Sequence, residues 1–225
     1  AVLDHVNGEI ERGNQVSRRC GRHAADLLRD GDRILTHCIA GAALAWMLWL
    51  AKRQGKALHL FATETRPYLQ GARLTAATAR ELDVPCTLIT DAMPAFLMQQ
   101  GKVDRFICAA DRIALDGHIS NKVGTYQIAL AARRHGVPFH VLGYDGPDTD
   151  TQSGDDIPIE ERAADELFFA RGVDQESGAQ ARVRTAVNGV DGYYPAFDIT
   201  PPDFITAIVT DHGVFPPGEI GSYFS

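Results

Sequence analysis

The sequence has few cysteines, no long apolar run and no excess of basic residues, and each absence excludes a class of protein. Its longest apolar segment, residues 40–51, is about half of the ~20 residues that a helix needs to cross a bilayer, so we expect no membrane span. No basic stretch followed by an apolar one marks a secretory signal. Lys and Arg number 22 against 29 Asp and Glu, which argues against a nucleic-acid-binding protein, because such proteins carry a clustered basic face.

The four cysteines, at positions 20, 38, 86 and 108, contain no Cys-x-x-Cys pair. This spacing suits neither a disulfide framework nor a zinc site, so we expect reduced thiols, no bound metal and a cytoplasmic location. His37 precedes Cys38 at the end of a predicted strand, where neighbouring side chains point to opposite faces, and the two are not expected to share a metal. The remaining composition, 45% hydrophobic and 23% charged, is that of an ordinary globular protein.

Short apolar segments alternate with segments of helical spacing. The predicted strands, each bounded by Gly, Pro or Asp, are residues 33–37, 57–62, 86–89, 105–109 and 139–143. The predicted helices are residues 17–29, 41–54, 71–82, 93–100 and 123–134, and glycines at 55, 101 and 136 are expected to end three of them. This alternation predicts right-handed βαβ units, and therefore an α/β fold with a Rossmann-like parallel sheet and helices on both faces.

The whole chain, residues 1–225, is predicted to be a single domain that begins with a helical segment over residues 1–31. Residues 144–156 are rich in Gly, Asp, Thr and Pro and predict a long loop, whereas residues 171–195 show only a weak pattern. The Pro-Pro pair at 201–202 is expected to begin a last helix over residues 203–211.

Ligands of an open parallel sheet bind beyond the carboxyl ends of its strands, which makes the polar residues there the candidate site. Cys38 precedes a helix, whose N-terminus favours a thiolate, so its sulfur is either an acidic reactive thiol or a small buried side chain. Asp111 follows the fourth strand and either transfers a proton, caps the next turn or pairs with Arg112. Asp91 follows the third strand and is expected to cap the helix from Met93.

Amide and cationic side chains on the same edge suit a phosphorylated sugar, because Arg and Lys bind phosphate whereas Asn and Gln bind hydroxyl groups. Helices expected to begin at Gly41, Gly71 and Gly124 would add backbone N–H donors. No nucleotide-binding glycine motif follows any strand. The candidate binding residues are Gly41, Arg66, Gln70, Asn121 and Lys122, with Arg73 either a further contact or solvated surface.

Seven segments extend this interpretation. In order they are Thr-His-Cys-Ile-Ala-Gly at 36–41, Glu-Thr-Arg-Pro-Tyr-Leu-Gln-Gly-Ala-Arg-Leu-Thr-Ala at 64–76, Leu-Ile-Thr-Asp-Ala-Met at 88–93, Ala-Asp-Arg-Ile at 110–113, Asn-Lys-Val-Gly-Thr-Tyr-Gln at 121–127, Ile-Pro-Ile-Glu-Glu-Arg at 157–162 and Pro-Ala-Phe-Asp-Ile-Thr-Pro at 195–201. Together they resemble the methylthioribose-1-phosphate isomerase family, which shares its fold with ribose-1,5-bisphosphate isomerase and the regulatory subunits of translation initiation factor 2B. The likeness runs from about residue 10 to residue 216.

This resemblance implies an aldose–ketose isomerase that acts on a 5-substituted ribose 1-phosphate, such as S-methyl-5-thioribose 1-phosphate, without a metal or organic cofactor. Catalytic positions of the family carry over to Cys38 and Asp111, and substrate-binding positions to Gln70, Asn121 and Lys122. A ribose-1,5-bisphosphate or 5-deoxyribose-1-phosphate isomerase stays an alternative, as does a non-catalytic regulatory subunit that binds a sugar phosphate or nucleotide. The resemblance also implies a homodimer or higher homo-oligomer, with residues 214–224 as one candidate contact segment.

The chain departs from the family pattern in two respects. The family usually has Asn where Ile39, Ala92 and Tyr194 stand, which leaves the identity of the substrate open. The family's N-terminal helical region, with its Arg-Gly-Ala phosphate motif, is not found in these 225 residues. We therefore expect the functional protein to carry further N-terminal residues that complete the phosphate site.

Overall fold

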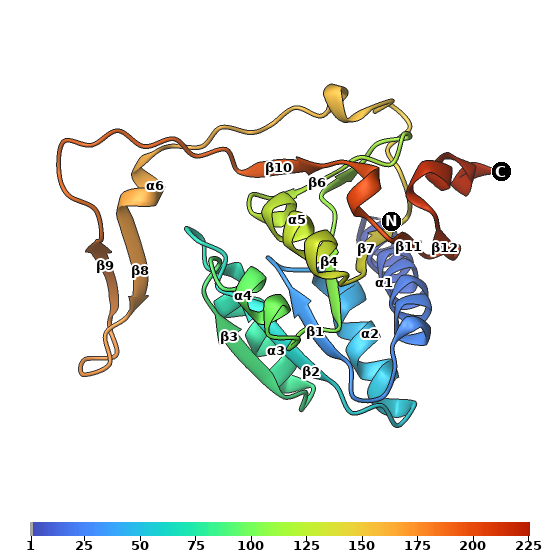
Figure 1. The fold of residues 1–225 in the computed structure, drawn as a ribbon, viewed down its shortest axis with the longest axis horizontal. Coiled ribbons are helices and arrows are strands. Elements are labelled where there is room, and N and C mark those ends of the chain that lie inside the picture. Colours follow the sequence, from blue (N-terminus) through green and yellow to red (C-terminus); the bar gives the residue numbers. More distant parts are fainter. Residues whose placement is uncertain (1) are drawn as a thin grey trace.

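A central seven-stranded sheet organises the molecule, in the order β12-β11-β7-β4-β1-β2-β3 (Figure 1). The computed structural model describes residues 2–225, and their side chains from Val6 onward. All five predicted strands are confirmed, and they pair in parallel. Their bounds are β1 (Arg33–Thr36), β2 (His59–Thr63), β3 (Cys86–Ile89), β4 (Arg105–Ala109) and β7 (Phe139–Tyr144).

Helices cover both faces of this sheet, as predicted. One buried apolar cluster joins the sheet to α1, α2 and α3, and a second joins it to α4 and α5. Gly55, Gly101 and Gly136 follow three of these helices with φ of +80°, +61° and +68°, the left-handed conformation that ends a helix without strain at glycine. The helices are α1 (Val2–Leu27), α2 (Gly41–Arg53), α3 (Ala76–Glu81), α4 (Pro94–Gln99) and α5 (Thr125–His135).

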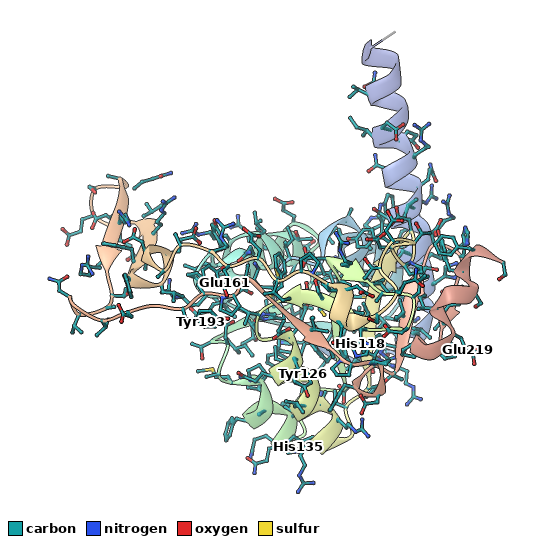
Figure 2. The ribbon with its side chains drawn as sticks, turned by 90° about the horizontal axis from the view of Figure 1, so that it is seen from above. His118, Tyr126, His135, Glu161, Tyr193 and Glu219 are labelled. Atoms are coloured by element: carbon teal, nitrogen blue, oxygen red, sulfur yellow. The ribbon has the colours of Figure 1, made fainter. Side chains whose placement is uncertain are left out.

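The first helix is longer than the one predicted over residues 17–29 and falls within the helical segment expected over residues 1–31. It starts well before residue 17, and Figure 2 shows its N-terminal half standing clear of the rest of the molecule. Residues 9–15 are all exposed, so no apolar stripe marked this half as helical. The C-terminal half packs on the sheet through Cys20, Ala24 and Ala25. No helix among the described residues is both long and apolar enough to span a bilayer.

The predicted helix over residues 203–211 is wrong. Pro202–Phe204 forms a single 3₁₀ turn, and β11 (Ala207–Thr210) then runs parallel to β7, while β12 (Val214–Phe215) returns antiparallel to β11. All four residues of β11 are buried. A short run buried on both faces shows no alternation, so periodicity alone does not separate it from a buried helix.

A second, smaller sheet crosses the carboxyl ends of the parallel strands. It consists of β5 (Arg112–Ile113), β6 (Ile119–Lys122) and β10 (Phe197–Thr200), all antiparallel. The predicted loop over residues 144–156 leads away from β7 and contains only a 3₁₀ turn, Gly154–Asp156. A longer 3₁₀ segment, Pro217–Phe224, closes the chain and buries Ile220 against the domain.

Residues 157–196 form an arm that extends sideways from the molecule, as both figures show. Its end carries α6 (Asp165–Phe168) and a hairpin of β8 (Phe169–Val173) and β9 (Gln180–Arg184). At its base the outgoing and returning segments of the arm run side by side, joined by an antiparallel β-bridge between Glu161 and Pro195. Residues 171–180 are exposed throughout. A hairpin that is exposed to solvent on both faces shows no alternation of apolar and polar residues, which is why the sequence did not predict it.

The strand order reverses between β1 and β4. From β1 the chain moves outward through β2 and β3, whereas β4, β7 and β11 extend in the other direction. In an open parallel sheet the loops that leave such a switch point diverge and form the ligand-binding crevice. The topology therefore places the candidate site after β1 and β4.

Candidate functional site

Cys38 and Asp111 follow the two strands that flank the switch point. The parallel register pairs Leu35 with Phe106, so the turn at Cys38 lies level with the end of β4. The two groups also interact electrostatically: the negative charge of Asp111 is one of the causes that raise the pKa of the Cys38 thiol. The fold thus brings together the two residues to which the sequence assigns catalytic roles.

Of the two alternatives that the sequence leaves open for Cys38, the structure shows the small buried side chain and not the acidic thiol. Burial raises the pKa of the Cys38 thiol above its ordinary value, the Ile39 amide opposes the shift, and the charge of Asp111 adds to it. The residue is only 5% exposed. Desolvation therefore outweighs the helix N-terminus, and the sulfur carries its proton at neutral pH, as a proton donor requires.

The backbone of Cys38 is unusual for a residue with a side chain. Its φ is +64°, in the left-handed region that favours glycine. The Cys38 amide donates to Oγ1 of Thr65 at 3.1 Å, and its carbonyl accepts from Oγ1 of Thr75 at 2.6 Å. Both threonines are buried. Two side chains from the segment after β2 thus hold the turn that carries the thiol.

His37 joins this turn to the smaller sheet. Its Nε2 lies 3.0 Å from the carbonyl oxygen of Val123, which only accepts, so Nε2 carries the hydrogen and Nδ1 accepts from the hydroxyl of Thr63 at 2.7 Å. Burial lowers the pKa of His37, which keeps the ring neutral. No group of three or more His, Cys, Asp or Glu within the described part of the chain is arranged to hold a metal ion.

Asp111 stands at the open side of this edge. Arg112 pairs instead with Asp148 at 2.7 Å, so the predicted alternative of an Asp111–Arg112 ion pair is wrong. Partial burial raises the pKa of the Asp111 carboxyl, and the ammonium of Lys122 opposes that shift. A carboxylate with a raised pKa is a better proton acceptor than a fully solvated one.

Asn121 and Lys122 lie on β6, and both are buried. The amide of Asn121 donates to Oγ1 of Thr125 at 3.0 Å. The ammonium of Lys122 lies 4.2 Å from the ring centre of Phe197, and among the described residues it has no carboxylate within ion-pair distance. The charge of Asp111 acts on this ammonium only from beyond ion-pair distance, so a bound phosphate would supply the close counter-charge that a buried cation needs, which makes Lys122 a phosphate-binding candidate.

Of the three predicted helix starts, two do not offer N–H groups to a phosphate. The carboxylate of Asp198 accepts from the amides of Gly124 and Tyr126 at 2.7 and 3.2 Å, so the end of α5 is occupied, and burial raises the pKa of Asp198 to about 6. Gly71 begins the π-helical turn Gly71–Thr75 as predicted, but the next amide, that of Ala72, donates to the carbonyl of Glu64 at 3.4 Å. A Cβ at Gly71 would sit 1.8 Å from the carbonyl oxygen of Thr63, which explains the glycine.

The start of α2 is the helix end that stays open. Gly41 has a φ of +64°, and a Cβ at this position would meet the hydroxyl of Tyr144 at 2.4 Å. That hydroxyl donates to the carbonyl of Ala40 and accepts from the amide of Ala43. A cavity of about 240 Å³ lies beside this turn, lined by Ile39, Ala40, Gly41, Ala42, Leu44, Ala45, Thr75 and Thr78.

Arg66 and Arg73 bind the arm rather than the site. The guanidinium of Arg66 donates to the carbonyls of Leu167 at 2.9 Å and Phe169 at 3.3 Å. That of Arg73 donates to the carbonyl of Arg171. Neither charge is therefore free to serve the phosphate site in this structure.

Asp91 does not cap the helix near Met93, so that prediction is wrong. Its two carboxylate oxygens accept from the amides of Thr65 and Arg66, each at 2.7 Å. The carboxylate thereby holds the segment that leads to Gln70. The Oε1 atom of Gln70 is buried and has no hydrogen-bond partner among the described residues, so it is available to a substrate hydroxyl.

The other three cysteines serve packing, as predicted. Cys20 and Cys108 are fully buried, and Cys86 is partly exposed on edge strand β3. The thiol of Cys20 donates to the carbonyl of Val209 at 3.2 Å. All four thiols are free.

The supporting residues Thr65, Thr75 and Asp198 were not singled out in the sequence. Each is a polar residue that becomes buried only when distant segments meet. Their one local signal is a threonine or aspartate inside an otherwise recognisable segment, and that signal does not reveal a hydrogen-bond partner.

Comparisons with known proteins identify the family of the chain. The model of the initiation factor 2 subunit family matches residues 1–217. The methylthioribose-1-phosphate isomerase of Fervidobacterium nodosum is 44% identical over 214 residues, covering 91% of this chain and 58% of that protein. The one of Syntrophus aciditrophicus is 44% identical over 222 residues, covering 95% and 58%. The chain thus spans less than two thirds of the length of these relatives.

Two solved structures show the same fold. The 5-methylthioribose 1-phosphate isomerase of Pyrococcus horikoshii superposes with a TM-score of 0.81 at 38% identity, over 93% of this chain and 59% of that one. Subunit delta of translation initiation factor eIF-2B from A. fulgidus superposes with a TM-score of 0.83 at 36% identity, over 97% and 63%. By sequence and by fold, the chain belongs to the initiation factor 2 subunit family.

Proposed function

We propose that this chain carries the catalytic domain of an aldose–ketose isomerase that converts a 5-substituted ribose 1-phosphate to the corresponding ribulose 1-phosphate. The observation that carries the proposal is the meeting of a protonated thiol, a carboxylate and a buried cation, Cys38, Asp111 and Lys122, at the switch point of the sheet. Relatives at 44% identity are named methylthioribose-1-phosphate isomerase, which supports the same reaction class.

In the proposed reaction, Cys38 gives its proton to the ring oxygen of the sugar as the bond from that oxygen to C1 breaks. Asp111 accepts the proton of the C2 hydroxyl as C2 becomes a carbonyl carbon, and the hydrogen on C2 moves to C1 with its bonding electron pair, which fills the position that the ring oxygen leaves. One proton enters the substrate and one leaves, which balances the step. No bond of the phosphate ester at C1 is broken. The assignment of the thiol as acid follows from its raised pKa, which keeps the sulfur protonated.

Binding is assigned by chemistry. Lys122 faces the phosphate as its counter-charge, and the amide at Gly41 adds a donor at the start of α2. Gln70 and Asn121 bind sugar hydroxyls. We propose S-methyl-5-thioribose 1-phosphate as the substrate, because a second phosphate would need another cation and Arg66 already binds the arm.

A 5-deoxyribose 1-phosphate meets the same requirement and stays in the proposal as an alternative, whereas ribose 1,5-bisphosphate fits less well. A second candidate function is a non-catalytic subunit that binds a sugar phosphate or nucleotide, favoured by the superposition on the eIF-2B subunit. The pairing of Cys38 with Asp111 favours the enzyme, since binding alone does not require an acid and a base.

A panel of pentose 1-phosphates, assayed for ketose formation, tests the proposal. We expect turnover of S-methyl-5-thioribose 1-phosphate and weaker turnover of ribose 1,5-bisphosphate. Binding of a sugar phosphate without turnover of any of them would establish the regulatory function instead. Because this chain spans 58% of the length of two isomerase relatives, the panel is run on the 225-residue chain and on a version extended at its N-terminus to the length of those relatives.

We also propose a homodimer in the cytoplasm. The four free thiols support a reducing compartment. The proposed contact segment near the C-terminus folds partly onto its own domain, where the hydroxyl of Tyr223 donates to Asp211 at 2.9 Å, but Val214 and Phe224 stay 43% and 54% exposed. Sedimentation at micromolar concentration tests the assembly, and a monomer would contradict it.

A further inference from the structure

We propose that Thr75, assisted by Thr65, is a positioning residue that holds Cys38 in a left-handed backbone conformation and thereby fixes the direction of its thiol. This inference rests on the proposed function, in which Cys38 is the acid. It adds a role for a hydroxyl group that the sequence did not single out.

The conformation of Cys38 needs support from its surroundings. With φ at +64°, the Cβ of an L residue crowds its own backbone, so a free turn would relax to negative φ. Such relaxation would rotate the Cα–Cβ bond and carry the sulfur away from its present direction. Backbone strain of this kind persists only where neighbouring groups hold it, and it is concentrated at functional sites.

Thr75 supplies the shorter of the two hydrogen bonds. Its Oγ1 donates to the carbonyl of Cys38 at 2.6 Å, compared with 3.1 Å for the bond from the Cys38 amide to Thr65. Thr75 is 1% exposed and Cys38 is 5% exposed, so water cannot readily replace a lost hydroxyl. The peptide after Cys38 is therefore fixed by this side chain.

The position of Thr75 is itself closely determined. It ends the π-helical turn Gly71–Thr75, and Gly71 packs so near to the carbonyl of Thr63 that no side chain fits between them. The hydroxyl of Thr63 in turn contacts that of Thr65 at 3.4 Å. The segment that follows β2 thus carries both groups that hold the turn after β1.

The chain contains a matched control for the hydroxyl. Thr36 lies two residues before Cys38 on β1 and is fully buried, yet its Oγ1 has no hydrogen-bond partner among the described residues. Replacing Thr36 by Val removes a buried hydroxyl of the same kind without removing a bond to Cys38. Thr75→Val removes the bond, and Thr75→Ser keeps it.

The test measures Cys38 directly. The rate of iodoacetamide labelling at Cys38, followed by peptide mass spectrometry from pH 6 to 10, reports the exposure and the apparent pKa of the thiol without any substrate. We expect Thr75→Val to label at least ~10-fold faster at neutral pH, with a lower apparent pKa, because burial is what raises the pKa of this thiol. Thr75→Ser and Thr36→Val should match the unaltered chain.

Steady-state kinetics add a second readout. With the sugar phosphate that the panel identifies, we expect Thr75→Val to lower kcat by ~10- to 100-fold and to change KM by less than ~3-fold, since the lost interaction acts on the acid and not on substrate binding. The proposal would be overturned if Thr75→Val labelled Cys38 at the rate of the unaltered chain. It would also be overturned if Thr75→Ser labelled as fast as Thr75→Val. If no sugar phosphate is turned over, the labelling result still stands, so the two proposals fail separately.

A stability comparison covers the case in which Thr75→Val does not fold. At an ordinary position Gly is less stabilising than Ala, but at positive φ the order reverses. We therefore expect Cys38→Gly to melt at the same temperature as Cys38→Ala or higher. A clearly lower melting temperature for Cys38→Gly would show that the turn is not held in the left-handed conformation.

Discussion

The parallel sheet and the arm are held in place by opposite means. The strands of the sheet are short, apolar and buried on both faces, so burial of side chains such as Phe106, Leu142 and Ile208 stabilises them. The arm is joined to the domain mainly by polar contacts: Arg66 and Arg73 of the domain donate to carbonyl oxygens of the arm, and Tyr68 of the domain contacts Arg162 of the arm. The proposed catalytic pair, Cys38 and Asp111, therefore stands on the part that burial makes rigid, whereas the arm is attached by polar contacts that water weakens.

The largest contrast is expected from truncations in the two regions. Phe106 is fully buried and stacks on Phe139 with ring centres 4.3 Å apart, so Phe106→Ala should lower the free energy of unfolding by about 3–5 kcal/mol. Val183 on the arm is 58% exposed, so Val183→Ala should change it by less than about 0.5 kcal/mol. Urea denaturation measures both. Equal effects would mean that the arm is buried against something in solution.

The catalytic pair provides the next contrast, this time in activity. Cys38→Ser and Asp111→Asn should each lower kcat by ~100-fold or more, because each removes a group that transfers a proton. Cys108→Ser, at a buried thiol of the same sheet, should act on stability and leave kcat within a few-fold. Near-normal turnover in either site variant would exclude that residue from the mechanism, and circular dichroism checks that the variants fold.

A pH dependence of stability is expected from His140, which lies near the amino end of β7, away from the candidate site. Burial lowers the pKa of His140 to about 4 from 6.5, and the charge of Arg105 adds to the shift while that of Asp32 opposes it. The unfolded chain therefore binds a proton that the folded chain does not, so the stabilisation is complete above pH 6.5 and is lost as the pH falls through about 4. Between pH 7 and pH 5, unfolding free energy should fall by about 2 kcal/mol from this group.

The matched variant isolates this contribution. His140→Gln has no titrating group at this position, so its stability should fall less steeply over the same pH range, and the difference between the two curves reports His140 alone. Parallel curves would show that His140 titrates alike in the folded and unfolded chain.

The smallest effect is expected where the arm meets the domain. Arg162 lies on the arm, where it pairs with Glu160 and Glu166 of the same segment, each at 2.8 Å, and it contacts Tyr68 of the domain. Arg162→Ala should lower global stability by less than about 1 kcal/mol, because these are partly exposed ion pairs, yet it should increase proteolytic cleavage within residues 157–196 several-fold. Exposed Arg134 on α5 provides the control. Unchanged proteolysis would show that other contacts hold the arm.

Much of the sheet could be predicted because its signals are local. The apolar segments of β1 to β4 and β7, and the glycines that end three helices, follow from neighbouring residues alone. The same reasoning failed at β11, where a short buried run is compatible with either a helix or a strand. It found no structure in the hairpin of the arm, since exposed strands show no apolar alternation.

The residues of the site could be named from the sequence, but their states could not. The order of motifs identified Cys38, Asp111 and Lys122, because motif order is a property of the chain. Whether the thiol is acidic depends on burial, and burial raised its pKa against the local expectation from the helix N-terminus. Likewise, the sequence predicted that Arg66 binds phosphate, but in the fold its guanidinium donates to the carbonyl of Leu167 on the arm.

The sequence by itself determined the βαβ order, the helix ends and the set of polar residues at strand ends, because these depend on contacts within one segment. The tertiary structure alone decided which of those residues meet. Thr65 and Thr75, which lie 27 and 37 residues from Cys38 along the chain, became its backbone partners, and Asp198 filled the helix end that phosphate was expected to use. Hydrogen bonding and desolvation act between atoms a few ångströms apart in space, and separation along the chain does not reveal that distance.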